Sequence, residues 1–183
     1  MVYLMRHGQD DETYIGGWSN VSLISEGVAE VKECANWIKD NLYIKKIICS
    51  DVKRAIETAE IVSEILGVEF TKSEKLREQN KGILNGALRS EADLICPGYK
   101  ERGVDFVFPK GESLEMLYER VKKFLDEFDI EDNTLLITHR GFINAIYYIT
   151  NNIPLDMKKK RFDVVPGSIH EYDNEMKRIK RIK

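Results

Sequence analysis

The stretch VYLMRHG, residues 2–8, joins a short apolar run to an arginine, a histidine and a glycine. The apolar residues 2–5 are typical of a strand buried on both faces, because no charged residue interrupts them. Arg6 and His7 are therefore expected at the carboxyl end of a central strand. In open α/β sheets, ligands bind in the crevice outside such strand ends. Gly8 would allow either a turn with positive φ or a close approach of a ligand to the backbone.

Outward from this strand, apolar strands alternate with amphipathic helices along the chain. Further strands are expected at about residues 44–50, 68–70, 135–137, 161–165, 168–172 and 177–182. Helices are expected from Ser25, as N-cap, through Ile38, and at about residues 52–66, 87–95, 112–128 and 142–149. This alternation indicates an α/β fold with a mostly parallel central sheet between two helical layers, a three-layer α/β/α domain.

Length and composition limit the classes of function. The 183 residues fit one domain, and the formal net charge of −3 gives no support to nucleic-acid or membrane-surface binding. No apolar run is long enough to span a membrane, and the N-terminus has no signal-peptide pattern. The three cysteines, Cys34, Cys49 and Cys96, are too scattered for a disulfide framework or a zinc site. A cytoplasmic protein with reduced thiols is expected.

Two further polar groups follow predicted strands. His139 and Arg140 come directly after the strand at 135–137, and Arg54 follows the strand that ends at Ser50. Because the carboxyl ends of parallel strands meet at one edge of a sheet, these side chains are expected to converge with Arg6 and His7. Guanidinium groups bind phosphate in a bidentate manner, and a neutral imidazole can attack phosphorus. The set favours phosphoryl transfer, although Arg54 taken alone is also compatible with a cation on a helix surface.

The segment LMRHG at residues 4–8 resembles the signature of the histidine phosphatase superfamily, which includes the cofactor-dependent phosphoglycerate mutases. Five further segments resemble that family in the same order: Gly17-Trp18-Ser19-Asn20 with Leu23 and Gly27; Ser50 with Arg54, Ala55, Thr58 and Ala59; Leu76-Arg77-Glu78 with Gly82 and Gly86; Pro109 with Gly111-Glu112-Ser113 and Arg120; and Thr138-His139 with Gly141. The resemblance covers most of the chain and implies a single phosphoglycerate mutase-like domain over residues 1–183, with a short lid or insertion at about 87–110.

The resemblance also implies roles for individual residues. His7 would be the nucleophile that becomes phosphohistidine, and Glu78 would be the proton donor to the leaving group. The phosphoryl group would be bound by Arg6, Arg54 and His139, with Gly8 and Arg140 beside them. Members of the family need no metal for this step. A small-molecule phosphate ester is the expected partner.

The sequence favours hydrolysis but leaves three functions open. The acidic run Asp10-Asp11-Glu12 would disfavour a substrate with a carboxylate near its phosphate. The segment between Gly86 and Pro109 is short and supplies only three cations, Arg89, Lys100 and Arg102, so water is expected to reach the intermediate. A metal-independent phosphomonoesterase without cofactor is therefore expected. The alternatives are a phosphoglycerate mutase that uses 2,3-bisphosphoglycerate, and a catalytically silent binding module. Substrate and oligomeric state stay open.

Overall fold

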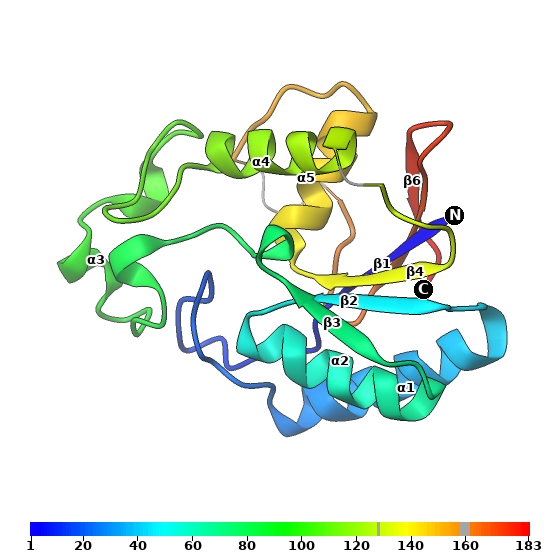
Figure 1. Cartoon of the computed structure of the whole chain (residues 1–183). Coiled ribbons are helices and arrows are strands. Elements are labelled where there is room, and N and C mark those ends of the chain that lie inside the picture. The colour runs from blue at the N-terminus through cyan, green and yellow to red at the C-terminus, as the bar shows by residue number, and fades with distance from the viewer. Residues whose placement is uncertain (128, 158–161) are drawn as a thin grey trace.

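The protein folds around one six-stranded sheet whose strand order is β3-β2-β4-β1-β5-β6 (Figure 1). This computed structural model describes residues 1–127, 129–157 and 162–183. Strands β1 to β4 are parallel to one another, whereas β5 is antiparallel to β1 and β6 is antiparallel to β5. The mostly parallel α/β sheet predicted from the sequence is confirmed.

The strands and helices have the following bounds. The strands are β1 (Val2–Arg6), β2 (Lys46–Ser50), β3 (Phe70–Ser73), β4 (Thr134–Thr138), β5 (Ile169–Asp173) and β6 (Arg178–Arg181). The helices are α1 (Ser25–Asn41), α2 (Lys53–Leu66), α3 (Ala92–Ile95), α4 (Leu114–Glu127) and α5 (Arg140–Thr150).

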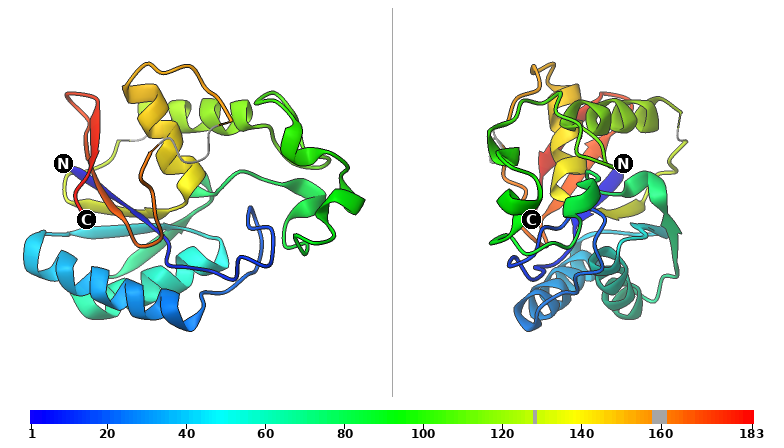
Figure 2. Two further views of the ribbon diagram at one scale, coloured as in Figure 1. Left: turned by 180° about the vertical axis from the view of Figure 1, so that it is seen from behind. Right: turned by 90° about the vertical axis from the view of Figure 1, so that its left-hand side faces the viewer.

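Residue alternation along the central strands divides the interior into two cores. In β1, Leu4 packs with α4 and α5, while Tyr3 and Met5 pack with α1 and α2. Strand β4 alternates in the same way, with Leu136 on one face and Leu135 on the other. Helices α1 and α2 therefore cover one face of the sheet, and α4 and α5 cover the other (Figures 1 and 2). Burial on both faces explains why these strands are continuous apolar runs.

A third apolar cluster lies outside the two sheet cores. Its buried members are Ile15, Leu84, Ala92, Cys96 and Phe108. They come from the loop after β1 and from the long connection between β3 and α4. The connection therefore packs around apolar side chains of its own, beyond the carboxyl ends of the strands, where Figure 2 shows it projecting from the sheet.

Several predicted boundaries were wrong. Strand β3 begins at Phe70 rather than at residue 68, and the helix expected over 87–95 is confined to Ala92–Ile95. Ser25 is the first helical residue and makes no side-chain cap; its hydroxyl donates to Glu26 instead. These are the places where local propensity and capping patterns compete with tertiary packing.

The expected strand at 161–165 was also wrong over its described part. Residues 162–165 carry no strand, whereas residue 161, like the predicted helix end at 128, lies outside the described residues. Val164 is buried there, and its carbonyl accepts a hydrogen bond from Arg6. The apolar pattern of this segment thus reflects packing against α5 and β1, rather than pairing in the sheet.

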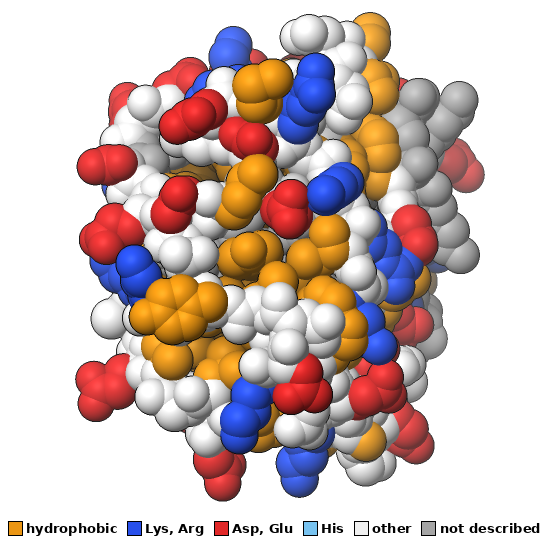
Figure 3. Space-filling view, turned by 90° about the vertical axis from the view of Figure 1, so that its right-hand side faces the viewer, with side chains coloured by type: hydrophobic (Ala, Val, Ile, Leu, Met, Phe, Trp, Pro, Cys, Tyr) orange, Lys and Arg blue, Asp and Glu red, His pale blue; other side chains and the backbone are white. Residues whose placement is uncertain are grey.

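None of the described helices is long and apolar enough to cross a membrane. Figure 3 shows the face that carries both chain termini and β6. Hydrophobic side chains gather near the middle of this face, among charged side chains of both signs. The parallel strands β1, β2 and β4 begin on this side, so their carboxyl ends point away from it.

His170 is fully buried in β5, as part of a hydrogen-bonded group away from those strand ends. Its Nδ1 lies 2.9 Å from the Tyr147 hydroxyl, and its Nε2 lies 2.9 Å from the Ser168 hydroxyl. Burial, with a smaller contribution from Arg181, lowers the pKa of His170 from 6.5 to about 4. The residue is neutral and structural at neutral pH.

This burial predicts a loss of stability in acid. As the pH falls below about 6.5, the unfolded chain takes up a proton at this histidine while the native chain does not. At about 1.4 kcal/mol per pKa unit, His170 is expected to remove about 3 kcal/mol of unfolding free energy between about pH 7 and pH 4. Urea unfolding at both pH values should show this loss, and His170→Gln should lose about 3 kcal/mol less. Equal losses in the two proteins would contradict the prediction.

Candidate active site

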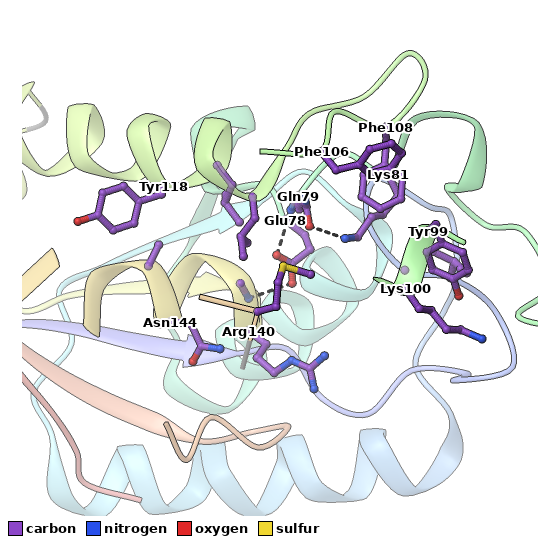
Figure 4. A pocket seen from close by; sticks show the side chains of 18 of the residues that line it. Glu78, Gln79, Lys81, Tyr99, Lys100, Phe106, Phe108, Tyr118, Arg140 and Asn144 are labelled. Carbon is purple, nitrogen blue, oxygen red and sulfur yellow. Dashed lines mark hydrogen bonds between the residues drawn. The ribbon is translucent and has the colours of Figure 1, made fainter. Parts of the chain in front are cut away.

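A pocket of about 280 Å³ opens at the carboxyl ends of the parallel strands. Five of the predicted residues line it together: Arg6 at the end of β1, His7 directly after it, Arg54 in α2, Glu78 in the β3–α4 connection, and Arg140 in α5. Arg140 and Gly141, at the start of α5, complete this end of the pocket. Figure 4 shows Glu78 near its centre, Arg140 and Asn144 on one side, and Lys81, Tyr99, Phe106 and Phe108 on another.

The imidazole of His7 is held in one orientation at the strand end. Its Nδ1 lies 2.7 Å from the Gly8 carbonyl oxygen. A carbonyl only accepts, so Nδ1 carries the proton and Nε2 keeps its lone pair. Burial, then Arg54 and Arg6, lower the pKa of His7 well below its ordinary value. The result is a neutral imidazole whose unprotonated Nε2 accepts a hydrogen bond from Arg54, and this protonation state is the one that can attack an electrophile.

Arg54 is the centre of the site and is only 2% exposed. Its Nε donates to His7 Nε2 at 3.1 Å, and its Nη2 donates to the Gly17 carbonyl at 2.9 Å. The same Nη2 lies 3.2 Å from Nδ1 of His139. Arg54 therefore connects both predicted histidines, and the reading of it as a surface cation is wrong.

His139 lies behind Arg54 and does not line the pocket. Its ring centroid is 5.1 Å from that of His7, and its side chain is fully buried. Because an arginine can only donate, His139 Nδ1 accepts from Arg54, and Nε2 donates to the Ser50 hydroxyl at 2.8 Å. Burial, followed by Arg54 and His7, lowers its pKa well below the ordinary value. In this state His139 is neutral and orients Arg54.

Arg6 and Arg140 bring further positive charge close to His7. Arg6 donates from Nη1 to the Val164 carbonyl at 2.9 Å, while its buried Nε has no hydrogen-bond partner among the described residues. Burial, and then Arg140, lower the pKa of Arg6 to about 10, so it stays charged at neutral pH. A buried guanidinium with an unused donor at a pocket wall is suited to an anion.

Glu78 reaches the pocket because the start of α5 leaves room for it. Its Oε2 accepts the Gly141 backbone N–H at 3.1 Å, and its Oε1 accepts the Gln79 N–H at 3.0 Å. A Cβ atom at position 141 would lie 2.1 Å from Glu78 Oε1. Only glycine at 141 allows this approach, which explains the glycine after His139 and Arg140 in physical terms.

Gly8 has neither of the roles proposed for its backbone. It is not among the glycines with positive φ, and it does not line the pocket. A Cβ there would meet Val31 at 2.5 Å and the Gly27 carbonyl at 2.8 Å, so Gly8 permits contact with α1. Its N–H donates to Thr58 and its carbonyl accepts from His7. Gly8 thus positions the His7 ring.

The far wall of the pocket combines rings with cations. Lys81 Nζ lies 4.4 Å from the Phe108 ring centroid, Lys100 Nζ lies 5.4 Å from that of Tyr99, and Arg102 Cζ lies 5.2 Å from that of Phe106. Such pairs are attractive and hold the cations over the rings. The wall can contact a flat apolar group and can also attract an anion.

The mouth carries charges of both signs. Asp10 and Glu12 line the pocket, whereas the Asp11 carboxylate turns back to accept from Thr13. Arg89 also lines the pocket, together with Lys100 and Arg102, and its Nε donates to the Glu12 carbonyl at 2.6 Å. The expectation of a negative mouth from the run at 10–12 was too simple, because position along a loop does not fix side-chain direction.

Three residues that shape the site were given no catalytic or phosphate-binding role from the sequence. Asp10 lies with its carboxylate 3.4 Å from Arg54 Nε, and Ser50 orients His139. Trp18 donates its indole N–H to the Glu78 carbonyl at 2.6 Å. The position of Ser50 at a strand end was a usable signal for it. The contact of Asp10 with Arg54 depends on loop folding and had no such signal.

Comparisons with known proteins bear on the whole chain. Residues 2–183 match the histidine phosphatase superfamily, branch 1. The probable phosphoglycerate mutase GpmB of Escherichia coli O1:K1 is 32% identical over 148 residues, which are 75% of this chain and 68% of that protein. Phosphoglycerate mutase-like protein 4 of Arabidopsis thaliana is 29% identical over 158 residues, covering 80% of this chain and 69% of that protein.

Solved structures resemble the fold over nearly its full length. Mycobacterial glucosyl-3-phosphoglycerate phosphatase superposes with a TM-score of 0.75 at 20% identity, covering 98% of this chain and 95% of that chain. The protein TTHB049 from Thermus thermophilus superposes with a TM-score of 0.71 at 27% identity, covering 100% of this chain and 98% of that chain.

Proposed function

The chain belongs to the histidine phosphatase superfamily, and from this premise we propose that it is a phosphomonoesterase that hydrolyses a small phosphate ester through phosphohistidine on His7. The observation that carries the proposal is the state of His7. Its Nδ1 donates to Gly8, so Nε2 is unprotonated, and it accepts a hydrogen bond from Arg54 at the wall of the pocket. A buried neutral imidazole among guanidiniums is a nucleophile prepared for an anionic phosphorus centre.

The proposed reaction has two steps. In the first, His7 Nε2 forms a bond to phosphorus while the ester P–O bond breaks, and Glu78 gives its proton to the leaving oxygen. In the second, Glu78 takes a proton from water, and the water oxygen replaces His7 on phosphorus. Arg6 and Arg54 attract the phosphoryl oxygens throughout. His139 acts through Arg54, which it contacts at 3.2 Å. No metal or cofactor enters either step.

The pocket supports a phosphate ester with an apolar or aromatic organic part. The rings of Tyr99, Phe106 and Phe108 line the wall away from His7. A compact phosphorylated acid would leave this wall without contact. A similar fold in a glucosyl-3-phosphoglycerate phosphatase is consistent with hydrolysis, although that likeness concerns the fold alone.

A phosphoglycerate mutase is the second candidate. The probable phosphoglycerate mutase GpmB is 32% identical, and Arg89, Lys100 and Arg102 all line the pocket. These cations could hold the second anionic group of 2,3-bisphosphoglycerate, which the mutase reaction would require.

Product analysis separates the two candidates. The protein is incubated with 3-phosphoglycerate, with and without 2,3-bisphosphoglycerate, and with p-nitrophenyl phosphate in parallel. We expect phosphate release from the aryl ester and no 2-phosphoglycerate. Bisphosphate-dependent 2-phosphoglycerate without phosphate release would establish the mutase instead. Absence of every product, with no uptake of phosphate onto the protein, would favour the silent binding module.

A further inference from the structure

Asp10 places a negative charge against the central cation of the pocket. Its Oδ2 lies 3.4 Å from Arg54 Nε, and its side chain is only 13% exposed. No other carboxylate of the described residues is ion-paired with Arg54. With its guanidinium 2% exposed, Arg54 has little contact with water, so Asp10 supplies its counter-charge in the empty site.

The same nitrogen of Arg54 faces both Asp10 and the nucleophile. Arg54 Nε donates to His7 Nε2 at 3.1 Å while it lies 3.4 Å from Asp10 Oδ2. A phosphoryl group attached to, or in contact with, His7 Nε2 must therefore place its oxygens beside Arg54 and close to the Asp10 carboxylate. Because the Asp10 carboxylate and His7 Nε2 both contact Arg54 Nε, we expect Asp10 to face the phosphoryl oxygens rather than the leaving group.

We propose that Asp10 is a competing internal anion that weakens the binding of phosphate dianion and so sets the rate of product release. This inference rests on the proposed phosphatase function. The carboxylate acts in two ways that add: it stabilises Arg54 when the site is empty, and it repels a bound dianion when the site is full. Both effects lower the affinity for inorganic phosphate.

The repulsion is expected to slow the chemical step little. In a loose phosphoryl-transfer transition state, the transferring group resembles metaphosphate and carries less negative charge than the bound dianion. The Asp10 carboxylate therefore destabilises the bound substrate and product more than it destabilises the transition state. Such differential binding raises KM and the product inhibition constant without lowering kcat.

The test is the inhibition constant of inorganic phosphate in Asp10→Asn. This variant keeps the shape of the side chain and an oxygen that Arg54 can bind, but removes the charge. We expect the inhibition constant and the KM for p-nitrophenyl phosphate both to fall about tenfold, and kcat to fall rather than rise. A purely structural role would instead leave the inhibition constant unchanged or raise it, and that result would overturn the inference.

Glu12→Gln is the matched control, because it removes one negative charge from the same loop at a residue with no ion pair to Arg54 among the described residues. The control is expected to change the inhibition constant less than about twofold. An equal decrease in both variants would show a general charge effect and overturn a specific role for Asp10. Calorimetric titration with phosphate distinguishes a failure of this inference from a failure of the proposed function. Normal turnover with unchanged phosphate affinity in Asp10→Asn removes only this inference, whereas no phosphate binding by any variant removes the proposed function too.

Discussion

Phosphate release from p-nitrophenyl phosphate is expected to fall by at least about four orders of magnitude in His7→Ala. The substitution removes the nitrogen that would bond to phosphorus, and the remaining cations can bind the ester without cleaving it. A second readout is direct: after a brief incubation with radiolabelled ester and acid-free denaturation, wild-type protein should retain label on histidine and the variant should not.

His170→Gln is the matched control for His7→Ala. Both variants replace a buried histidine, but His170, unlike His7, lies outside the pocket. At neutral pH this control should retain turnover. Turnover that persists in His7→Ala, or labelled histidine in that variant, would contradict nucleophilic catalysis by His7.

The second large effect is expected for Glu78→Gln, and it should depend on the leaving group. An alkyl alkoxide needs a proton as it departs, so hydrolysis of an alkyl phosphate should slow about 10²- to 10⁴-fold. A p-nitrophenolate leaves without assistance, so the first step with the aryl ester should slow less than about tenfold. Single-turnover measurement of both esters isolates this step from dephosphorylation.

Glu112→Gln provides the comparison for Glu78→Gln. Glu112 accepts from the Asn80 N–H at 2.8 Å and pairs with Arg120 at 2.9 Å, and it does not line the pocket. Any decrease in the single-turnover rate of Glu112→Gln should be the same for the alkyl and the aryl phosphate. If Glu78→Gln also slows both esters equally, Glu78 is not the proton donor.

The fold could be predicted because its signals are local and repeated. Each central strand is a short apolar run, and each neighbouring helix has a clear apolar face, so the α/β class followed. The family was inferred separately, from the segments that resemble its motifs. Strand β1 shows the reason: the alternation of Tyr3, Leu4 and Met5 between two cores requires helices on both sides. The convergence of Arg6, His7 and Arg54 then follows from parallel strand ends meeting at one edge.

Features that depend on loop conformation could not be predicted. The fully buried position of His139 behind Arg54, the contact between Asp10 and Arg54, and the mixed charge of the mouth all arise where the chain has no regular repeat. The segment at 162–165 was misread for a related reason, since apolar residues that pack without pairing have the same composition as a short strand. The catalytic roles of the site residues stay predictions that the variants above test.

The separate apolar cluster under the far wall of the pocket has a consequence for how this protein could change over evolutionary time. Its members pack among themselves, while the strands that position Arg6, His7 and His139 are stabilised by two other cores. Mutations in the wall can therefore accumulate without disturbing these three residues. A chain built in this way can acquire a new substrate by exchanging one peripheral module, while the inherited chemistry at the sheet edge is preserved.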